Sequence, residues 1–116
     1  MLEQPKKYFL YTHTRVDNGD IMYVGIGTQP KNGLLYSRAY NTFSRNPSWR
    51  AIVRITNYKV NILLEADTRE EVEIEEKRLI ALYGRRDLGT GSLVNRTEGG
   101  EKVGAPHTKT KRKSRA

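Results

Sequence analysis

The sequence predicts a single α+β domain, with a small three-stranded antiparallel sheet flanked by helices. Three observations predict this fold. Two short runs of aromatic and aliphatic residues flank a turn-forming cluster, which is typical of a β-hairpin. A third run alternates between apolar and polar residues. One longer segment has helical periodicity between a capping pattern and a glycine. With 116 residues, the chain has room for one hydrophobic core.

The strands of the expected sheet cover residues 7–13, 21–26 and 58–65. The first two runs, KYFLYTH and IMYVGI, flank the cluster VDNGD, and we expect them to form a hairpin. The third run, YKVNILLE, alternates and then becomes continuously apolar, as a partly buried strand does. Residues 92–95 are expected to add a short extended piece.

The register of the hairpin decides which side chains share a face of the sheet. A two-residue turn would put Tyr11 and Tyr23 on opposite faces. We expect instead a bulged three-residue turn over 17–19, with its glycine in the left-handed region, which pairs Val16 with Asp20. One face then presents Tyr11, His13, Tyr23 and Gly25, and the other turns Tyr8, Leu10, Met22 and Val24 toward the core.

Two shorter helices are expected before the third strand. Residues 34–42 follow an irregular loop that contains Gly, Pro and Asn, and they could make a short helix. Pro47 suits the first position of a second helix that runs to about Thr56, with Asn46 as its cap.

The clearest helix begins at the capping box of Thr68 and Glu71 and ends at Gly84. Its apolar side chains form one stripe: Val72, Leu79, Ile80 and Tyr83. Glu76 lies in the middle of that stripe, where an isolated buried carboxylate would cost several kcal/mol. Its charge must therefore be compensated, either by a salt bridge to an Arg or Lys or by a bound cation.

Composition limits the available chemistry. The chain has no cysteine, and His13 and His107 are too far apart to indicate a histidine site, so any metal must sit on oxygen ligands. No stretch approaches the roughly 18 apolar residues of a membrane span, and no apolar run follows the first residues. We therefore expect a cytoplasmic protein that does not interact with membranes.

The formal net charge of +8 favours a polyanionic partner. Five of these charges lie near the C-terminus, at Lys109, Lys111, Arg112, Lys113 and Arg115, and the first 106 residues carry only +3. We expect a domain over residues 1–103 and a basic, disordered tail over 104–116. The tail is either a solvated end or an arm that contacts phosphates. An arm with five phosphate contacts would give a log–log salt slope of about −4.5.

Several of these residues occur in an order and spacing that resemble the GIY-YIG endonuclease superfamily. Phe9-Leu10-Tyr11 precedes Tyr23-Val24-Gly25 by eleven residues. Three further positions follow in the family's order: Arg38, Glu76 and Asn95. The resemblance covers residues 7–100, and the segments around Tyr40 and Trp49 are similar to a compact branch found in bacteria or phages.

The resemblance implies metal-dependent hydrolysis of nucleic-acid phosphodiester bonds, with DNA the expected substrate and 5′-phosphate and 3′-hydroxyl ends. Each active site would nick one strand, and a homodimer could cut both. Glu76 would hold one Mg²⁺ or Mn²⁺. Tyr23 is the expected general base and Tyr11 the residue that orients water or phosphate, with these roles interchangeable. Arg38 would brace the scissile phosphate, and Arg45 is the alternative for that role.

The candidate residues are also compatible with structural roles and with two further functions. Each tyrosine taken alone is explained by packing within a strand, and Asn95 is either a turn residue or a support for the geometry of the site. Tyr40 and the basic tail are the expected nucleic-acid contacts. The alternative function is a catalytically inactive nucleic-acid-binding module, favoured by Ile26 and Thr42 at positions where related nucleases carry Lys and His or Tyr. The second alternative is a small RNA-associated protein that is unrelated to nucleases. In such a protein the placement of Glu76 would be coincidental.

Overall fold

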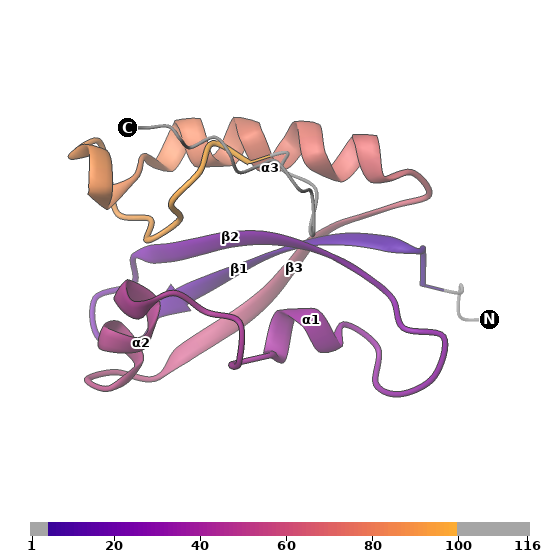
Figure 1. The fold of residues 1–116 in the computed structure, drawn as a ribbon, viewed down its shortest axis with the longest axis horizontal. Coiled ribbons are helices and arrows are strands. Elements are labelled where there is room, and N and C mark those ends of the chain that lie inside the picture. Colours follow the sequence, from indigo (N-terminus) through magenta and orange to yellow (C-terminus); the bar gives the residue numbers. More distant parts are fainter. Residues whose placement is uncertain (1–4, 100–116) are drawn as a thin grey trace, which may run out of the picture.

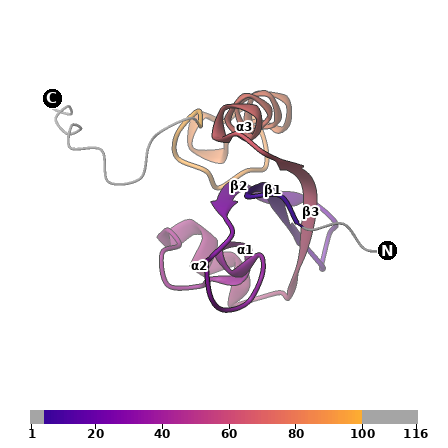
Figure 2. The same ribbon diagram turned by 90° about the vertical axis from the view of Figure 1, so that its right-hand side faces the viewer.

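The computed structural model describes residues 5–99, which form a three-stranded antiparallel sheet with helices on both faces (Figures 1 and 2). The strands are β1 (Tyr8–Arg15), β2 (Ile21–Thr28) and β3 (Tyr58–Ala66). Their order is β2-β1-β3, so β1 is central and β2 is an edge strand. The predicted α+β architecture and its three strands are confirmed.

The register of the hairpin agrees with the prediction, but the turn does not. Tyr11 pairs with Gly25 as expected. However, the Arg15 N–H donates to the Asp20 carbonyl at 2.8 Å, so the loop has four residues, 16–19, rather than three. The irregularity lies further along in β2, where Met22 is an additional residue between two successive partners of β1. The longer loop and this bulge together restore the predicted register.

The bulge also changes the direction of one core side chain. Met22 was expected on the same face as Leu10, and this is wrong. It packs instead with Trp49 and Ile52 of α2, whereas Leu10 and Ile21 belong to the cluster under α3. An extra residue in a strand shifts the alternation of side chains, so residues before and after the bulge cannot follow one simple pattern.

Four helical segments complete the described fold: α1 (Ser37–Tyr40), α2 (Pro47–Val53), α3 (Arg69–Tyr83) and the 3₁₀ turn η1 (Arg86–Leu88). The predicted helix over 34–42 is much shorter in the structure. Tyr36 precedes it with φ 62°, a left-handed conformation that an α-helix does not accommodate. The second helix ends at Val53, before the expected Thr56.

The expected starts of the second and third helices agree with the structure. The Asn46 side chain accepts a hydrogen bond from the Trp49 N–H at 2.9 Å, and the Thr68 side chain accepts one from the Glu71 N–H at 3.4 Å. Both are N-cap interactions, which stabilise the first turn of a helix. The long helix ends before Gly84, as predicted.

The helices form two layers, with α3 on one face of the sheet and α1 and α2 on the other (Figures 1 and 2). Residues after η1 return to the free edge of β2, where the Val94 N–H donates to the Met22 carbonyl at 2.7 Å. Leu93 makes only an isolated bridge with Arg85, so the expected extended piece at 92–95 is not a fourth strand. Over residues 5–99, no helix has the length and apolar character that a membrane crossing requires.

Candidate functional site

A pocket of about 420 Å³ lies along β2 and is lined from both layers of the fold. The side chains on its wall are Tyr11, Tyr23, Ile26, Thr28, Arg38, Arg69, Glu76 and Thr97. Four of the five residues that the sequence suggested for catalysis therefore share one cavity. They come from β1, β2, α1 and α3, which are far apart along the chain.

The carboxylate and the arginine reach this pocket from opposite sides of the sheet. Glu76 belongs to α3, and Arg38 belongs to α1 on the other face. They meet because β2 is an edge strand, so a pocket beside it is accessible from both layers. Glu76 is half-buried. The site lies at an edge of the sheet and not on one of its faces.

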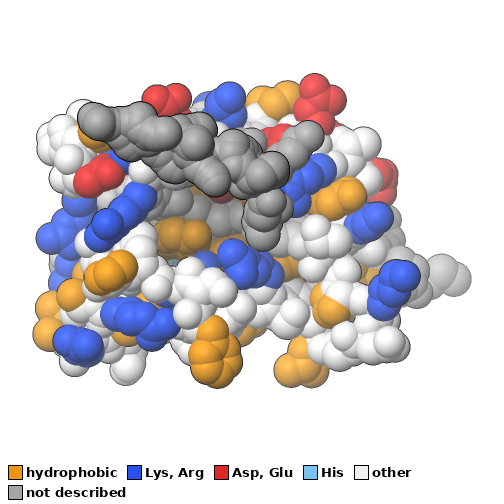
Figure 3. Space-filling view, in the orientation of Figure 1, with side chains coloured by type: hydrophobic (Ala, Val, Ile, Leu, Met, Phe, Trp, Pro, Cys, Tyr) orange, Lys and Arg blue, Asp and Glu red, His pale blue; other side chains and the backbone are white. Residues whose placement is uncertain are grey.

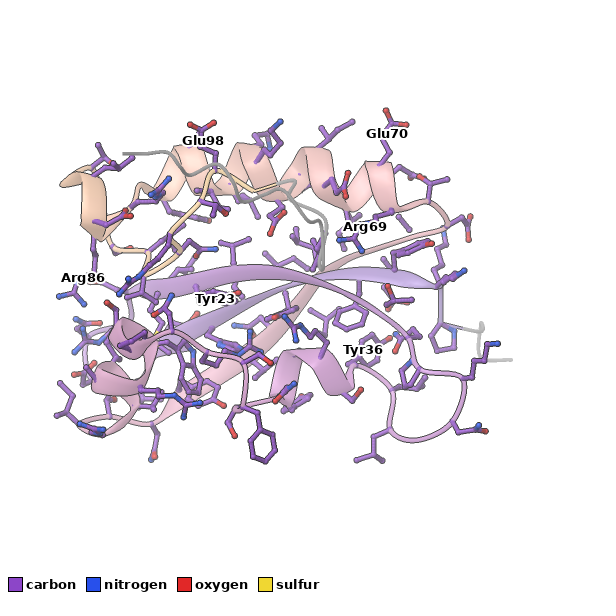
Figure 4. All side chains as sticks on the ribbon, in the orientation of Figure 1. Tyr23, Tyr36, Arg69, Glu70, Arg86 and Glu98 are labelled. Carbon is purple, nitrogen blue, oxygen red and sulfur yellow. The ribbon has the colours of Figure 1, made fainter. Side chains whose placement is uncertain are left out.

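Arg69 is a pocket residue that the sequence analysis missed. It lies seven residues before Glu76, a spacing that places two side chains on the same side of an α-helix. Figure 4 shows Arg69 pointing from α3 toward the sheet, while Glu70 points away from it. The Arg69 guanidinium also pairs with Glu73 at 2.7 Å. The helical spacing to Glu76 was the signal that could have identified it.

The hydroxyl of Tyr11 is held within the protein at the back of the pocket. Tyr11 is 1% exposed, and its hydroxyl oxygen accepts a hydrogen bond from Arg45 Nη1 at 2.9 Å. Burial raises the pKa of Tyr11 above its ordinary value, and the neighbouring Tyr23 adds to this, while Arg45 and Arg38 oppose it. Tyr11 is therefore a neutral phenol at neutral pH.

The position of the Tyr11 ring explains why its partner in β2 is a glycine. A Cβ atom on Gly25 would lie 2.5 Å from both Cζ and the hydroxyl oxygen of Tyr11. Contacts this short do not occur, so any larger residue would displace the ring. The glycine of the Tyr-Val-Gly segment thus lets the Tyr11 side chain cross β2 toward the pocket.

Tyr23 lies beside Tyr11, with 6.2 Å between the ring centroids. It is half-buried, and Figure 4 shows it at β2. The predicted pairing of these two tyrosines in one site is therefore present in the geometry. The sequence offered either Arg38 or Arg45 for the contact with the phosphate. Of these two, only Arg38 is on the pocket wall. Arg45 is 7% exposed and lies behind the wall.

His13 supports the pocket from within the core and is not one of the residues that line it. It is fully buried, its Nε2 donates to the Ala39 carbonyl at 2.8 Å, and its Nδ1 accepts from Trp49 Nε1 at 3.0 Å. An indole N–H only donates and a carbonyl only accepts, so these partners fix the neutral tautomer. Burial lowers the pKa of His13 to about 4. This side chain ties α1 and α2 to β1.

Asn95 secures the chain that borders the pocket. Its side-chain oxygen accepts from the Val24 N–H at 3.0 Å, and its side-chain amide donates to the Val24 carbonyl at 2.8 Å. The side chain thus bonds to β2 as a neighbouring strand would. This placement fits the expected role of holding local geometry, and Asn95 is not on the pocket wall.

The remaining expected contacts lie elsewhere. Tyr40 is 61% exposed and borders a separate hollow with Leu34 and Leu35, so it does not belong to the pocket beside β2. The five basic tail residues and the proposed domain boundary at residue 103 lie outside the described residues.

The two layers carry opposite charge. Between Asp20 and Glu65 the sequence has six lysines and arginines and no acidic residue, whereas α3 has five glutamates and three basic residues, a net charge of −2. In Figure 3, acidic side chains lie on the α3 side of the visible face, and lysines and arginines lie on both sides. A polyanion approaching the pocket would be attracted to the α1–α2 side.

The donor set of the pocket fits a loosely held divalent cation. Residues 5–99 contain no group of three or more His, Cys, Asp or Glu side chains that could hold a metal ion. Glu76 provides one carboxylate to the wall, beside the hydroxyl groups of Tyr11, Tyr23, Thr28 and Thr97. Mg²⁺ is often bound by one or two carboxylates together with water and substrate phosphates. Glu76 is therefore the residue that could hold such an ion.

Comparisons of the chain with protein-family models, with curated proteins and with solved structures found no match.

Proposed function

We propose that the pocket beside β2 hydrolyses phosphodiester bonds of nucleic acid, with DNA as the expected substrate and Mg²⁺ or Mn²⁺ as the cofactor. The observation that carries this proposal is the convergence of Tyr11, Tyr23, Arg38 and Glu76 on one cavity. These are residues through which the sequence resembles the GIY-YIG endonucleases. Packing within a strand explains either tyrosine taken alone, so the proposal rests on their position beside Arg38 and Glu76.

Two arginines on opposite walls are suited to bind the scissile phosphate. Arg38 approaches from α1 and Arg69 from α3. Guanidinium groups donate paired hydrogen bonds to phosphate oxygens, and these bonds strengthen as negative charge develops in the transition state. Because Glu73 already pairs with Arg69, Arg38 carries the larger share of this role.

Glu76 is the residue that would hold the divalent ion. When bound, such an ion supplies Lewis-acid polarisation of the phosphate and neutralises part of its charge. The carboxylate of Glu76 is half-buried, and Arg69 lies on the same wall. Glu76 thereby adds a negative charge to a pocket that otherwise carries two arginines.

The two tyrosines have different environments and take different roles. Burial and the raised pKa of Tyr11 keep it protonated, so it orients the attacking water or a phosphate oxygen through its hydroxyl. Tyr23 is more exposed, and in its phenolate form it would act as the general base that takes the proton from the attacking water. One such pocket nicks one strand, and cleavage of both strands requires a second copy or a second encounter.

A catalytically inactive nucleic-acid-binding module is the alternative function. The observation that favours it is Ile26, which forms part of the pocket wall at a position where related nucleases carry lysine. The wall beside Tyr23, the expected base, is therefore apolar where a lysine would be cationic. The basic α1–α2 layer would serve such a module as well as it serves an enzyme.

Nicking of supercoiled plasmid with Mg²⁺ or Mn²⁺ tests the proposal. We expect open circles with the wild-type chain and none after addition of EDTA. Glu76→Gln should abolish nicking, while Glu70→Gln, on the same helix but pointing away from the sheet, should nick at the wild-type rate. Retarded migration of DNA in a gel without cleavage by either metal would establish the binding module instead.

A further inference from the structure

We propose that Arg45 is a positioning residue that joins the Tyr11 hydroxyl to the backbone of α1 and directs the Tyr11 O–H into the pocket. This inference rests on the proposed function of the pocket. It concerns a buried cation that forms no part of the wall and belongs to the turn between α1 and α2.

The guanidinium of Arg45 uses three N–H groups on three different partners. Nη1 donates to the Tyr11 hydroxyl at 2.9 Å, Nη2 donates to the Arg38 carbonyl at 2.7 Å, and Nε donates to the Asn41 carbonyl at 2.8 Å. The last two acceptors lie at the C-terminal end of α1, a helix of four residues. Terminal carbonyls of a helix need partners from outside it, and Arg45 provides them.

Aromatic rings surround the same cation. Its central carbon lies 5.0 Å from the ring centroid of Tyr23, 5.5 Å from that of Tyr11 and 5.8 Å from that of Trp49. Ring faces attract a guanidinium, and more strongly where water is excluded. Three rings and three oxygen acceptors therefore compensate the burial of this charge and fix its position.

The chemistry of the hydrogen bond decides where the proton of Tyr11 can point. A guanidinium has no acceptor, so the Tyr11 oxygen must accept from Arg45, and the phenol must use its own proton elsewhere. Tyr11 lines the pocket, which offers that direction. Arg45 thus presents the Tyr11 O–H to a water or phosphate in the pocket. The same guanidinium also bonds the backbone carbonyl of Arg38. It therefore sets the distance between Tyr11 and Arg38 in the pocket.

Lysine cannot replace Arg45 in this role. Its ammonium group is a compact point charge without the planar fork that reaches three separated acceptors. Arg45→Lys therefore keeps the positive charge and loses part of the alignment. Arg78→Lys is the matched control, because Arg78 is an exposed residue of α3 that pairs with Glu75. It has no place in the pocket.

The first experiment measures plasmid nicking in a double-mutant cycle. We expect Arg45→Lys to lower the rate constant for nicking about 10- to 100-fold, as loss of a hydrogen bond to a charged group does. It should change DNA affinity little, and Arg78→Lys should have the wild-type rate. In the Tyr11→Phe background, Arg45→Lys should cause a much smaller further loss. Equal losses in both backgrounds would show that Arg45 does not act through Tyr11.

The second experiment does not depend on activity. The ¹³Cζ resonance of Tyr11 is followed against pH in the metal-free protein, where Tyr23, Arg45 and Arg38 are the groups that influence its charge. Arg45→Lys and Arg45→Met should shift the midpoint upward in whichever variant retains the amide spectrum of the folded protein. An unchanged midpoint with lysine at this position would overturn the inference. The titration gives its answer even if the wild-type chain does not cleave DNA.

Discussion

The two layers that enclose the sheet are held in place by different means. Helix α3 has fifteen residues, an N-cap at Thr68 and a stripe of buried apolar side chains, so its position follows from local sequence and from packing on the sheet. Helix α1 has four residues, and distant side chains hold it. His13 and Arg45 bond its carbonyls, and the Tyr36 N–H that precedes it donates to Gln29. The pocket thus has one self-supporting wall and one wall that depends on a hydrogen-bond network.

This difference indicates which substitutions separate activity from stability. Changes in the network beneath α1 should alter both, because the same bonds hold the fold and aim Arg38. Changes at the cap of α3 should alter stability alone. Of the four substitutions that test this contrast, we expect the largest effect from Arg38→Ala and the smallest from Thr68→Ala.

The largest effect is expected at Arg38, which lies on the wall that the hydrogen-bond network supports. Arg38→Ala should lower the nicking rate about 100- to 1,000-fold, because it removes a donor to the phosphate in the transition state. Unfolding in urea should be unchanged, since Arg38 is half-exposed and its backbone, not its side chain, is held by Arg45. Lys59→Ala, on the opposite edge strand, is the matched control. Greater loss with Arg69→Ala would assign the phosphate contact to α3 instead.

Acid should weaken the network through His13. Its pKa is about 4 in the folded protein and about 6.5 when unfolded, so the unfolded chain binds more protons between these values. The contribution of His13 to stability is complete above pH 6.5 and declines as the pH falls toward 4. Urea unfolding should show a loss of about 2 kcal/mol between pH 7 and pH 5. His13→Gln should remove most of this pH dependence, and a variant with the wild-type slope would contradict the assignment.

Removal of one donor from the same network should have a smaller effect. Trp49→Phe keeps an aromatic ring in the core but loses the Nε1–H that bonds His13 at 3.0 Å. A buried acceptor without its donor costs about 1.5 kcal/mol, which urea unfolding at pH 7 can measure. We also expect reduced nicking, because α1 loses support. Lower stability with unchanged nicking would show that this part of the network does not position Arg38.

The smallest effect is expected at the cap of the self-supporting wall. Thr68→Ala removes the side chain that accepts from the Glu71 N–H and should cost about 1 kcal/mol in urea unfolding. The buried stripe of α3 keeps Glu76 in place, so the nicking rate at 25 °C should be that of the wild type. A marked loss of nicking would mean that the end of α3 also controls the pocket.

The same contrast explains how much could be predicted from the sequence. The long helix, the three strands and the placement of Glu76 on the inner side of α3 follow from periodicity and capping, which are local signals. The start of α1 could not be predicted, because Tyr36 adopts its left-handed conformation where Gln29 and Glu65 bond it. Nothing near Tyr36 in the sequence indicates those partners.

The hairpin and Arg45 show two other limits. The register of the hairpin was predicted correctly, but its turn was not. The loop is one residue longer than predicted, and the bulge at Met22 compensates for the change in register. Arginine is almost never fully buried unless it is paired, so the burial of Arg45 among three rings had no signature in the sequence. Arg69 could have been predicted from its helical spacing to Glu76.

The hydrogen bonds that close one half of β2 also bear on how copies of the chain could associate. An uncovered strand edge can pair with a strand of another molecule and begin aggregation. Along the first half of β2, Ser92 bonds the Ile21 carbonyl, Val94 bonds the Met22 carbonyl and Asn95 bonds both groups of Val24. A second copy therefore finds no free partners there, and the other half remains open as the pocket. The half of β2 that residues 92–95 cover is thereby closed to strand pairing, while the half that borders the pocket stays accessible to a substrate.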